Sequence, residues 1–252
     1  MRLLQPVKIS GWGLNGKVAK MEVNGADGGA GIVFNRSIKA AVENAQVIGN
    51  CTCLKSGKGM VMMVEHFLAA CYGIGISDLM VDIEGGMLPF GDGSAQPFVR
   101  AFLRAGLVNT KSQETVKLRS PIGVKDGKGF ILLVPGEKLR IHCLIDYPHL
   151  GRQFFSGFIT RKFFCEEIAP ARTFGRPPRH LKERLGFGLK RVRGWVFPKR
   201  LRFNNEPCRH KVLDLLGDLA LLGRPLQGEI FAFNPSHSLN LILVRRLKEM
   251  GA

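Results

Sequence analysis

Residues 209–218 read RHKVLDLLGD and place a histidine and two aspartates four residues apart inside an apolar run. Positions i, i+4 and i+8 share one face of an α-helix, so a helix over residues 212–222 would present His210, Asp214 and Asp218 together and turn its leucines toward a core. Imidazole and carboxylate groups on one helix face can reach the same metal ion. The stretch therefore predicts either part of a metal site or the solvated face of a surface helix.

Two other segments offer polar residues that could complete such a site. A hydrolytic metal site uses three protein ligands and leaves one position for water, so a helix with two ligands needs a third from elsewhere. Glu65 and His66 stand side by side at the front of an apolar, helix-favouring segment, where polar groups are costly to bury without partners. His237 follows a loop and precedes residues 241–244, which have the composition of a strand; a histidine in such a place is more often structural than catalytic.

Together these segments resemble the zinc-dependent UDP-3-O-acyl-N-acetylglucosamine deacetylases of lipid A biosynthesis. The resemblance runs nearly end to end, with the same order and spacing of motifs. The motifs are SGWGLNGK at residues 10–17, GIVFNR at 31–36, VEHFLAA at 64–70, DGSA at 92–95, IDYPHLG at 145–151, ARTFG at 171–175, residues 210–219 and the segment around His237. Because several separate motifs match, the resemblance is far more specific than any one of them.

The resemblance implies a set of metal ligands and a base. The zinc ligands fall on His66, His210 and Asp214, each of the right residue type. Glu65 corresponds to the general base that activates water for attack on an amide carbonyl. The expected cofactor is Zn²⁺, and Fe²⁺ can occupy the same ligands.

The resemblance also implies roles for residues around the metal. Thr173 corresponds to a hydroxyl donor for the oxyanion, and His237 to the acid that protonates the leaving amine, held in its cationic form by Asp218. Lys211 corresponds to a residue that positions substrate near the metal. Phe174 corresponds to an aromatic side chain at the mouth of an acyl passage. A turn hydroxyl, a solvated helix charge and a core ring are the ordinary alternatives for Thr173, Lys211 and Phe174.

Some positions depart from the family pattern. The insert that forms the acyl passage corresponds to residues 176–200, which lack the expected glycine-rich and aliphatic run and carry several arginines instead. Acyl-chain length therefore does not follow from the sequence. Asn15 stands where many members have histidine, Ser236 replaces a common glycine, and Asn234 occupies a position that often carries a substrate-facing lysine.

Length and composition fit an α+β protein of two similar two-layer domains. The chain has 252 residues and 45% hydrophobic content, enough for one large core or two modest ones. Strands are expected at residues 7–11, 20–23, 31–34, 79–83, 130–134, 139–145, 229–233 and 239–244, and helices at 65–72, 97–105, 161–168 and around His210. A polar linker at 109–114 divides domain 1–110 from domain 116–252. The resemblance implies helices sandwiched between the sheets, with the active site at the domain junction.

The start of the chain does not read as a secretory signal, and no apolar run approaches the roughly 20 residues of a membrane span, so we expect a cytoplasmic protein. Its six cysteines are scattered, and Cys51 and Cys53 have no second pair with which to close a zinc site, so buried reduced thiols are expected. The oligomeric state does not follow from the sequence, and a monomer is the simpler expectation.

The net charge of +17 bears on the choice of partner. Much of the basic excess falls between Arg152 and Arg202 and would attract polyanions. The expected partner is a small acylated UDP-sugar, and contact with an anionic membrane surface would also benefit. No zinc-finger spacing or aromatic RNA-binding motif is present, so no dedicated nucleic-acid binding is expected. The alternative to an enzyme is a non-catalytic homologue whose basic surface binds anionic lipid or nucleic acid.

Overall fold

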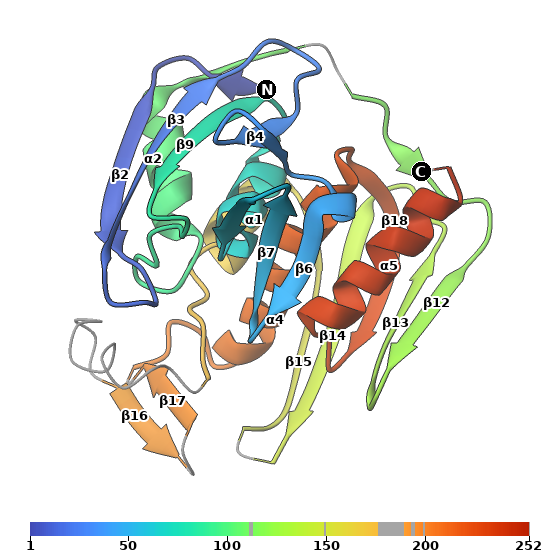
Figure 1. Cartoon of the computed structure of the whole chain (residues 1–252). Coiled ribbons are helices and arrows are strands. Elements are labelled where there is room, and N and C mark those ends of the chain that lie inside the picture. Colours follow the sequence, from blue (N-terminus) through green and yellow to red (C-terminus); the bar gives the residue numbers. More distant parts are fainter. Residues whose placement is uncertain (111–112, 149, 176–188, 193–194, 199, 252) are drawn as a thin grey trace.

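A computed structural model describes residues 1–110, 113–148, 150–175, 189–192, 195–198 and 200–251 (Figure 1). Two large sheets flank a central layer of helices, as expected for the α+β sandwich. In the described part of the chain, no helix combines the length and apolar character needed to cross a membrane.

The first half of the chain forms two sheets. The larger has the strand order β2 (Val7–Trp12), β3 (Val18–Gly25), β9 (Leu79–Glu84), β4 (Ile32–Phe34) and β5 (Ile38–Lys39), with β4 parallel to β9 and all other pairs antiparallel. The smaller is the antiparallel sheet β6 (Ala45–Ile48), β7 (Cys51–Ser56) and β8 (Gly59–Met62), preceded by a 3-10 turn at Val42–Asn44. The short strands β1 (Arg2–Leu3) and β10 (Leu107–Val108) pair with each other.

Two helices pack on these sheets. Helix α1 (Glu65–Ile74) ends at Gly75, which adopts the left-handed conformation that glycine tolerates. Helix α2 (Gln96–Ala105) has a proline in its first turn and ends before Gly106, as its sequence predicts.

The second half forms one six-stranded sheet. The main order is β12 (Ile122–Asp126), β13 (Gly129–Val134), β18 (Leu226–Phe233), β14 (Leu139–Tyr147) and β15 (Gly151–Phe158), and β11 (Val116–Lys117) pairs with β18. Strand β18 runs parallel to β14 and β11, and the remaining pairs are antiparallel. Inward side chains alternate with outward ones along β13 and β14, so one face of the sheet is buried by helices.

The helices of the second half include the one that carries His210. A single α-helical turn, α3 (Arg161–Phe163), continues as a π-helical turn at Phe164–Ile168. Helix α4 (Glu206–Leu219) is followed by a 3-10 turn at Ala220–Leu222, and α5 (His237–Glu249) closes the chain. Strands β16 (Leu189–Val192) and β17 (Trp195–Pro198) form a separate hairpin.

Helices α1 and α4 lie side by side in the central layer (Figure 1). Their close approach depends on Gly217, because a Cβ there would collide with the backbone carbonyl oxygen of Glu65. One hydrophobic cluster runs continuously through both halves and includes Phe67 of α1, Leu213 of α4 and Leu243 of α5. The two halves therefore share a core, and polar residues at the start of α1 face those along α4.

The predicted strand at residues 239–244 is wrong. These residues lie inside α5, whose N-cap Ser236 accepts a hydrogen bond from the backbone N–H of Leu239. The apolar run is one turn of a longer helical pattern that continues to Leu247, and this pattern outweighs the strand-like composition. His237 is consequently the first residue of a helix and does not precede a strand. The predicted insert at 176–200 falls largely outside the described residues.

Candidate active site

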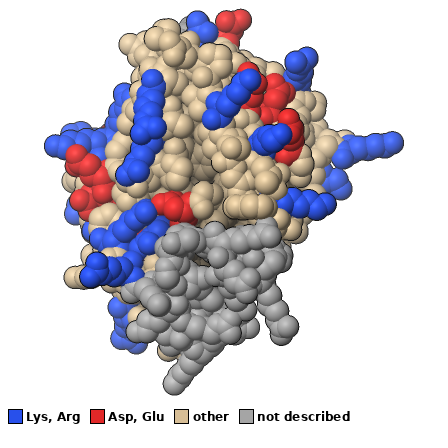
Figure 2. All heavy atoms as spheres, turned by 90° about the vertical axis from the view of Figure 1, so that its left-hand side faces the viewer, with Lys and Arg blue, Asp and Glu red and all other residues tan. Residues whose placement is uncertain are grey.

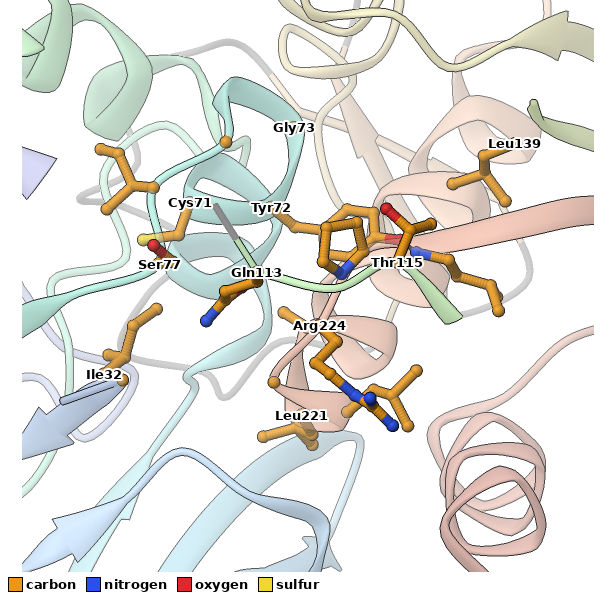
Figure 3. A pocket seen from close by; sticks show the side chains of 18 of the residues that line it. Ile32, Cys71, Tyr72, Gly73, Ser77, Gln113, Thr115, Leu139, Leu221 and Arg224 are labelled. Atoms are coloured by element: carbon orange, nitrogen blue, oxygen red, sulfur yellow. Dashed lines mark hydrogen bonds between the residues drawn. The ribbon is translucent and has the colours of Figure 1, made fainter. Parts of the chain in front are cut away.

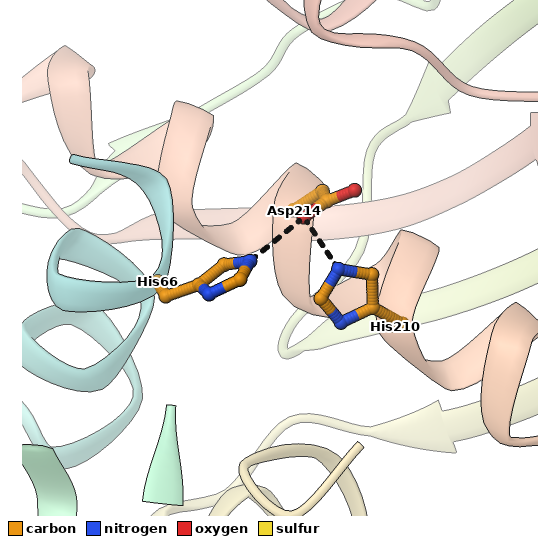
Figure 4. Close-up of side chains that lie close together, drawn as sticks. All are labelled: His66, His210 and Asp214. Atoms are coloured by element: carbon orange, nitrogen blue, oxygen red, sulfur yellow. Dashed lines mark ion pairs between the residues drawn. The ribbon is translucent and has the colours of Figure 1, made fainter. Parts of the chain in front are cut away.

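His66, His210 and Asp214 converge at the junction of α1 and α4, and we call them the metal triad (Figure 4). The Asp214 Oδ1 atom lies 3.3 Å from His210 Nε2 and 3.7 Å from His66 Nε2. The two imidazole rings are nearly perpendicular, with centroids 5.0 Å apart. One potential ligand atom from each residue lies within 4.8 Å of the others, and all three residues are buried. The predicted ligands therefore meet although they come from distant parts of the sequence.

The histidines of the metal triad are held as neutral imidazoles. Burial, reinforced by His210, lowers the pKa of His66 to about 3, and burial also lowers the pKa of His210. The ring of His210 is oriented by an Nδ1 contact of 3.1 Å with the carbonyl oxygen of Ala171. If Nδ1 carries the hydrogen and donates it there, the lone pair of Nε2 faces Asp214.

Asp214 carries the negative charge of the metal triad. Burial opposes its ionisation, but the positive charge of Lys211, with a further contribution from His237, outweighs burial and holds the pKa of Asp214 well below its usual range. The Lys211 ammonium donates to Asp214 Oδ2 at 2.7 Å. Burial likewise opposes the charge of Lys211, yet Asp214 raises the pKa of Lys211 above its usual value. Lys211 is thus a largely buried cation at the site, with its side chain 13% exposed, rather than a solvated helix charge.

This donor set fits a divalent metal ion. The approaches of 3.3 and 3.7 Å to Asp214 are too long for good hydrogen bonds, and neither Nε2 atom has another partner among the described residues. Potential ligand atoms that converge on one another without bonding leave space between them for an ion. Two neutral imidazoles and a carboxylate suit zinc, and the same set also accepts other first-row metals.

Glu65 lies beside the metal triad and is 4% exposed. Burial raises the pKa of Glu65 to about 8; the charge of His237 lowers this value, and that of Asp214 raises it. Its Oε2 atom accepts a hydrogen bond of 3.1 Å from the backbone N–H of Thr52. The carboxyl group therefore has a proton affinity close to that required of a general base near neutral pH.

A second polar group, which we call the acid cluster, consists of Thr52, Asp218, His237 and Asn240. His237 Nδ1 lies 2.8 Å from Asp218 Oδ2, which also accepts from the side-chain amide of Asn240 at 2.8 Å. The Thr52 hydroxyl donates to the other oxygen, Asp218 Oδ1, at 2.6 Å. Burial alone would lower the pKa of His237, but Asp218 and Asp214 raise it to about 9. The imidazolium form is therefore favoured at neutral pH.

The segment that carries Thr173 and Phe174 is anchored by a buried ion pair. The Arg172 guanidinium binds Glu206, the first residue of α4, with Nε 2.8 Å from Oε1 and Nη2 3.1 Å from Oε2. The backbone N–H of Thr173 donates to Gly93 at 2.7 Å. The Phe174 ring lies edge-on to His210, with centroids 6.2 Å apart. Both residues therefore reach the predicted site.

The site opens into a cavity of about 710 Å³. Its walls include the metal triad, Glu65, His237, Lys211, Thr173 and Phe174. Of the positions that depart from the family pattern, Asn15 and Ser236 also line this cavity. Asn234 is turned toward the sheet, where its side-chain oxygen accepts from the backbone N–H of Asp146 at 2.8 Å.

A larger cavity of about 1300 Å³ lies away from the metal triad (Figure 3). Its walls include Tyr72, Thr115, Leu139 and Arg224 and none of the predicted site residues.

On the molecular face shown in Figure 2, Lys and Arg side chains are scattered, with smaller groups of Asp and Glu between them. Neither cavity volume nor the distribution of charged side chains on this face identifies the active site, whereas the convergence of the potential metal ligands does.

Sequence reasoning missed three residues of this site. Thr52 and Asn240 complete the acid cluster, and Glu206 anchors the segment of Thr173. No local pattern marks Thr52, because its partner Asp218 is 166 positions away in the chain. Ser236 at the N-cap of α5 is a local signal that could have placed Asn240 one helical turn after His237.

All six cysteines are free thiols, as expected, and only Cys165 is partly exposed. The candidate metal site uses none of them.

The site combines two buried imidazoles and one carboxylate that could hold a metal ion with an adjacent carboxyl group of raised pKa and an open cavity. This combination of groups is typical of the class of metal-dependent hydrolases.

Comparison with known proteins narrows this class to one family. The chain matches the family model described as UDP-3-O-acyl N-acetylglycosamine deacetylase over residues 2–185 and 187–249. A relative of that name from Solibacter usitatus is 34% identical, with 96% of this chain and 89% of the relative covered. Another, from Chlamydia caviae, is 32% identical over 98% of this chain and 96% of the relative. The chain belongs to the UDP-3-O-acyl-N-acetylglucosamine deacetylase family.

Proposed function

We propose that this protein is a zinc-dependent amidohydrolase that removes the acetyl group from UDP-3-O-acyl-N-acetylglucosamine, the committed step of lipid A biosynthesis. The observation that carries the proposal is the convergence of His66, His210 and Asp214 beside Glu65, at the wall of a cavity that can admit a substrate. Family membership supplies the substrate class.

His66, His210 and Asp214 would hold the metal, which we propose to be Zn²⁺, with Fe²⁺ able to use the same ligands. When bound, such an ion polarises a carbonyl group and lowers the pKa of water toward about 7. Asp214 supplies the negative charge that offsets the cation, and the carbonyl of Ala171 keeps the His210 ring in its ligating orientation.

Glu65 acts as the general base in this proposal. The raised pKa of about 8 gives the carboxylate a high affinity for the proton that the attacking water loses. The Thr52 backbone N–H holds one carboxyl oxygen, so the group keeps a defined orientation toward the cavity. The tetrahedral intermediate then develops an oxyanion, and Thr173 on the cavity wall is placed to donate to it.

His237 protonates the departing amine. Its raised pKa of about 9 keeps the ring charged, and Asp218 holds Nδ1 so that Nε2 remains available for proton transfer. Lys211 adds a positive charge at the cavity wall that positions the substrate and favours the developing negative charge. The two carboxyl groups therefore have different tasks: Glu65 accepts a proton, and Asp218 stabilises a cation.

Phe174 at the cavity wall is the proposed contact for the acyl chain. Burial of roughly a dozen methylene groups at about 0.8 kcal/mol each would favour acylated over unacylated sugar. The insert that would line the rest of the passage lies largely outside the described residues.

We further propose that the two structural units span residues 1–110 and 116–252. In this proposal the enzyme is a monomer that acts on its nucleotide-sugar substrate in the cytoplasm. It also makes peripheral contact with an anionic membrane.

A deacetylation assay tests the proposed function. The purified protein should release acetate from UDP-3-O-acyl-N-acetylglucosamine, lose this activity in a chelator and regain it when Zn²⁺ is restored. Glu65→Gln should abolish turnover while it retains bound metal, because the amide cannot accept the proton. Binding of anionic vesicles or DNA in a salt-sensitive manner, without any turnover, would instead support the non-catalytic alternative.

A further inference from the structure

Thr52 contacts both of the groups to which proton transfer is assigned. It lies in β7 and is fully buried. Its backbone N–H donates to Glu65 Oε2 at 3.1 Å, and its hydroxyl donates to Asp218 Oδ1 at 2.6 Å. The same hydroxyl oxygen lies 3.1 Å from His237 Nδ1. One residue of a strand in the first half therefore joins the base of that half to the acid of the second.

The direction of these hydrogen bonds determines how the His237 ring is held. A threonine hydroxyl has one hydrogen, and an ionised Asp218 can only accept, so that hydrogen points at Asp218. The lone pairs of the hydroxyl oxygen then face His237 Nδ1, which can share its own hydrogen between Thr52 and Asp218. With Nδ1 occupied in this way, His237 Nε2 is directed toward Asp214, 3.9 Å away.

We propose that Thr52 is a positioning residue that fixes Glu65 and His237 relative to each other across the reacting carbon. Thr52 is not among the residues that line the active-site cavity, so it acts through its neighbours and not on the substrate. The inference rests on the proposed deacetylase function. Since small misplacements of catalytic groups are costly, loss of the hydroxyl should lower turnover strongly while substrate binding is kept.

The test compares Thr52→Val, which removes the hydroxyl at nearly constant shape, with Thr52→Ser, which keeps it. Thr52→Val should lower kcat by roughly 10²-fold with little change in KM, and Thr52→Ser should retain most of the wild-type kcat. When Thr52→Val is combined with His237→Ala, the further fall in kcat should be much smaller than in the wild-type background, because the hydroxyl acts largely through His237. Zinc content and thermal unfolding are measured for every variant.

Three results would overturn the positioning role: an unchanged kcat in Thr52→Val, an equal loss in both backgrounds, or a loss in Thr52→Ser as large as in Thr52→Val. If Thr52→Val does not fold, Thr52→Ser still decides, because a purely structural role of the methyl group predicts that this variant also fails. Absence of turnover in the wild-type protein would sink the proposed function, and the present inference with it.

A separate observation concerns the two cysteines that flank Thr52. Cys51 and Cys53 project from the same face of β7, with their Sγ atoms 3.8 Å apart. Cys51 lines the active-site cavity, whereas Cys53 is fully buried behind it. Two residues of a strand span about 6.6 Å, which is near the upper limit of Cα separation in disulfides. To form a bond of about 2.05 Å the two sulfurs must move closer together, and contraction of the backbone at Thr52 would bring the Cα separation nearer to its usual value.

We infer that Cys51 and Cys53 form a reversible disulfide when hydrogen peroxide enters the cavity. The hydrogen bond between the two thiols lowers the pKa of Cys53 to about 7 and raises the pKa of Cys51 well above its usual value, so near neutral pH the pair readily loses one proton and the charge lies on Cys53. The Cys53 thiolate accepts the proton of Cys51 while the cavity-facing sulfur of Cys51 attacks one peroxide oxygen; the O–O bond breaks, hydroxide leaves, and Cys51 becomes a sulfenic acid. Cys53 then attacks that sulfur, the S–S bond forms, and a second hydroxide leaves.

The two thiol protons convert both hydroxides to water, so the sulfur pair loses the two electrons that peroxide gains. Intracellular disulfides of this transient kind are typical of redox sensing. Because contraction at Thr52 would displace its contacts with Glu65 and Asp218, oxidation should lower deacetylation. This consequence rests on the proposed function, whereas formation of the disulfide does not.

Peroxide treatment of the zinc-loaded protein, followed by mass spectrometry, tests the disulfide directly. The peptide that contains both cysteines should lose two hydrogen atoms, regain them in dithiothreitol, and track the loss and recovery of turnover. Cys53→Ser should resist inactivation relative to its own untreated sample, and Cys165→Ser, which removes the partly exposed thiol elsewhere, should respond like the wild type. An unmodified peptide, or equal inactivation of Cys53→Ser, would contradict the inference; a disulfide without any wild-type turnover would leave it standing and refute the proposed function.

Discussion

The metal triad and the acid cluster occupy the same buried junction but use their hydrogen-bonding capacity in opposite ways. In the acid cluster, distances of 2.6 to 3.1 Å join every member to a partner. In the metal triad, the imidazole nitrogens approach the carboxylate only to 3.3 and 3.7 Å. The bonds around Asp218 therefore hold the acid cluster together within the protein, although the side-chain oxygen of Asn240 has no partner among the described residues, whereas the ligand atoms of the metal triad are spaced to hold an ion between them.

The largest expected effect breaks the metal triad. His66→Ala should reduce bound zinc to background and abolish turnover, because two ligands on α4 cannot complete the site. His142→Ala, a histidine on the outer strand face where it stacks on Phe231, is the matched control and should keep its zinc. Elemental analysis of purified, dialysed variants checks this, and full zinc occupancy in His66→Ala would remove His66 from the ligand set.

The next effect separates the two groups. His237→Ala removes the acid but leaves the metal triad intact, so zinc content should stay at the wild-type level while kcat falls by roughly 10²-fold to 10⁴-fold. Parallel metal analysis and steady-state kinetics measure both quantities. A fall of less than tenfold would mean that another group protonates the amine, and simultaneous loss of zinc would mean that the two groups are not separate.

A smaller effect tests the junction on which both groups depend. Gly217→Ala would push a methyl group into the Glu65 carbonyl and force α1 and α4 apart, so we expect a loss of about 1 to 3 kcal/mol in the free energy of unfolding. Gly123→Ala places its methyl group in open space and serves as the control. Urea unfolding of both variants gives the comparison, and equal stabilities would show that the helix contact tolerates the methyl group.

The smallest effect is a change in pH dependence within the acid cluster. The His237 pKa of about 9 in the folded protein lies above its ordinary value of 6.5, so proton binding stabilises the fold fully below pH 6.5 and this contribution is lost as pH rises through 9. Asp218→Asn removes the main cause of the raised pKa and should flatten this part of the profile. The free energy of unfolding of the metal-free proteins is measured between pH 6 and 10. Its slope against pH should differ between the wild type and Asp218→Asn, and equal slopes would contradict this role of Asp218.

The sequence predicts much of the fold where local patterns are strong. Glycine and proline signals place α2 correctly, and strand-like apolar composition places β13 and β14. The sheet of β6, β7 and β8 was not predicted, because the run CTCL in β7 is buried on both faces and shows no alternation. The strand predicted at 239–244 fails for the opposite reason: a short apolar run has no periodicity of its own, and the amphipathic pattern of α5 becomes visible only over its full length.

The same contrast between local patterns and long-range contacts applies to the residues of the candidate site. The four-residue spacing from His210 to Asp214 is a local signal, and the resemblance of several motifs adds His66 and Glu65. The role of Thr52 could not be predicted, because its contacts with Asp218 and His237 span 166 and 185 residues and arise only when β7 is placed beside α4 and α5. Ligands that share a motif can be predicted from sequence, whereas residues that position them depend on tertiary packing.

We expect one divalent ion to bind between α1 and α4. An anomalous difference map at the zinc absorption edge, from crystals of the zinc-loaded protein, measures this binding directly. It should contain a single strong peak about 2.0 to 2.2 Å from His66 Nε2, His210 Nε2 and an Asp214 carboxylate oxygen. A map with no peak there, or with its strongest peak at Cys51 and Cys53, would contradict it.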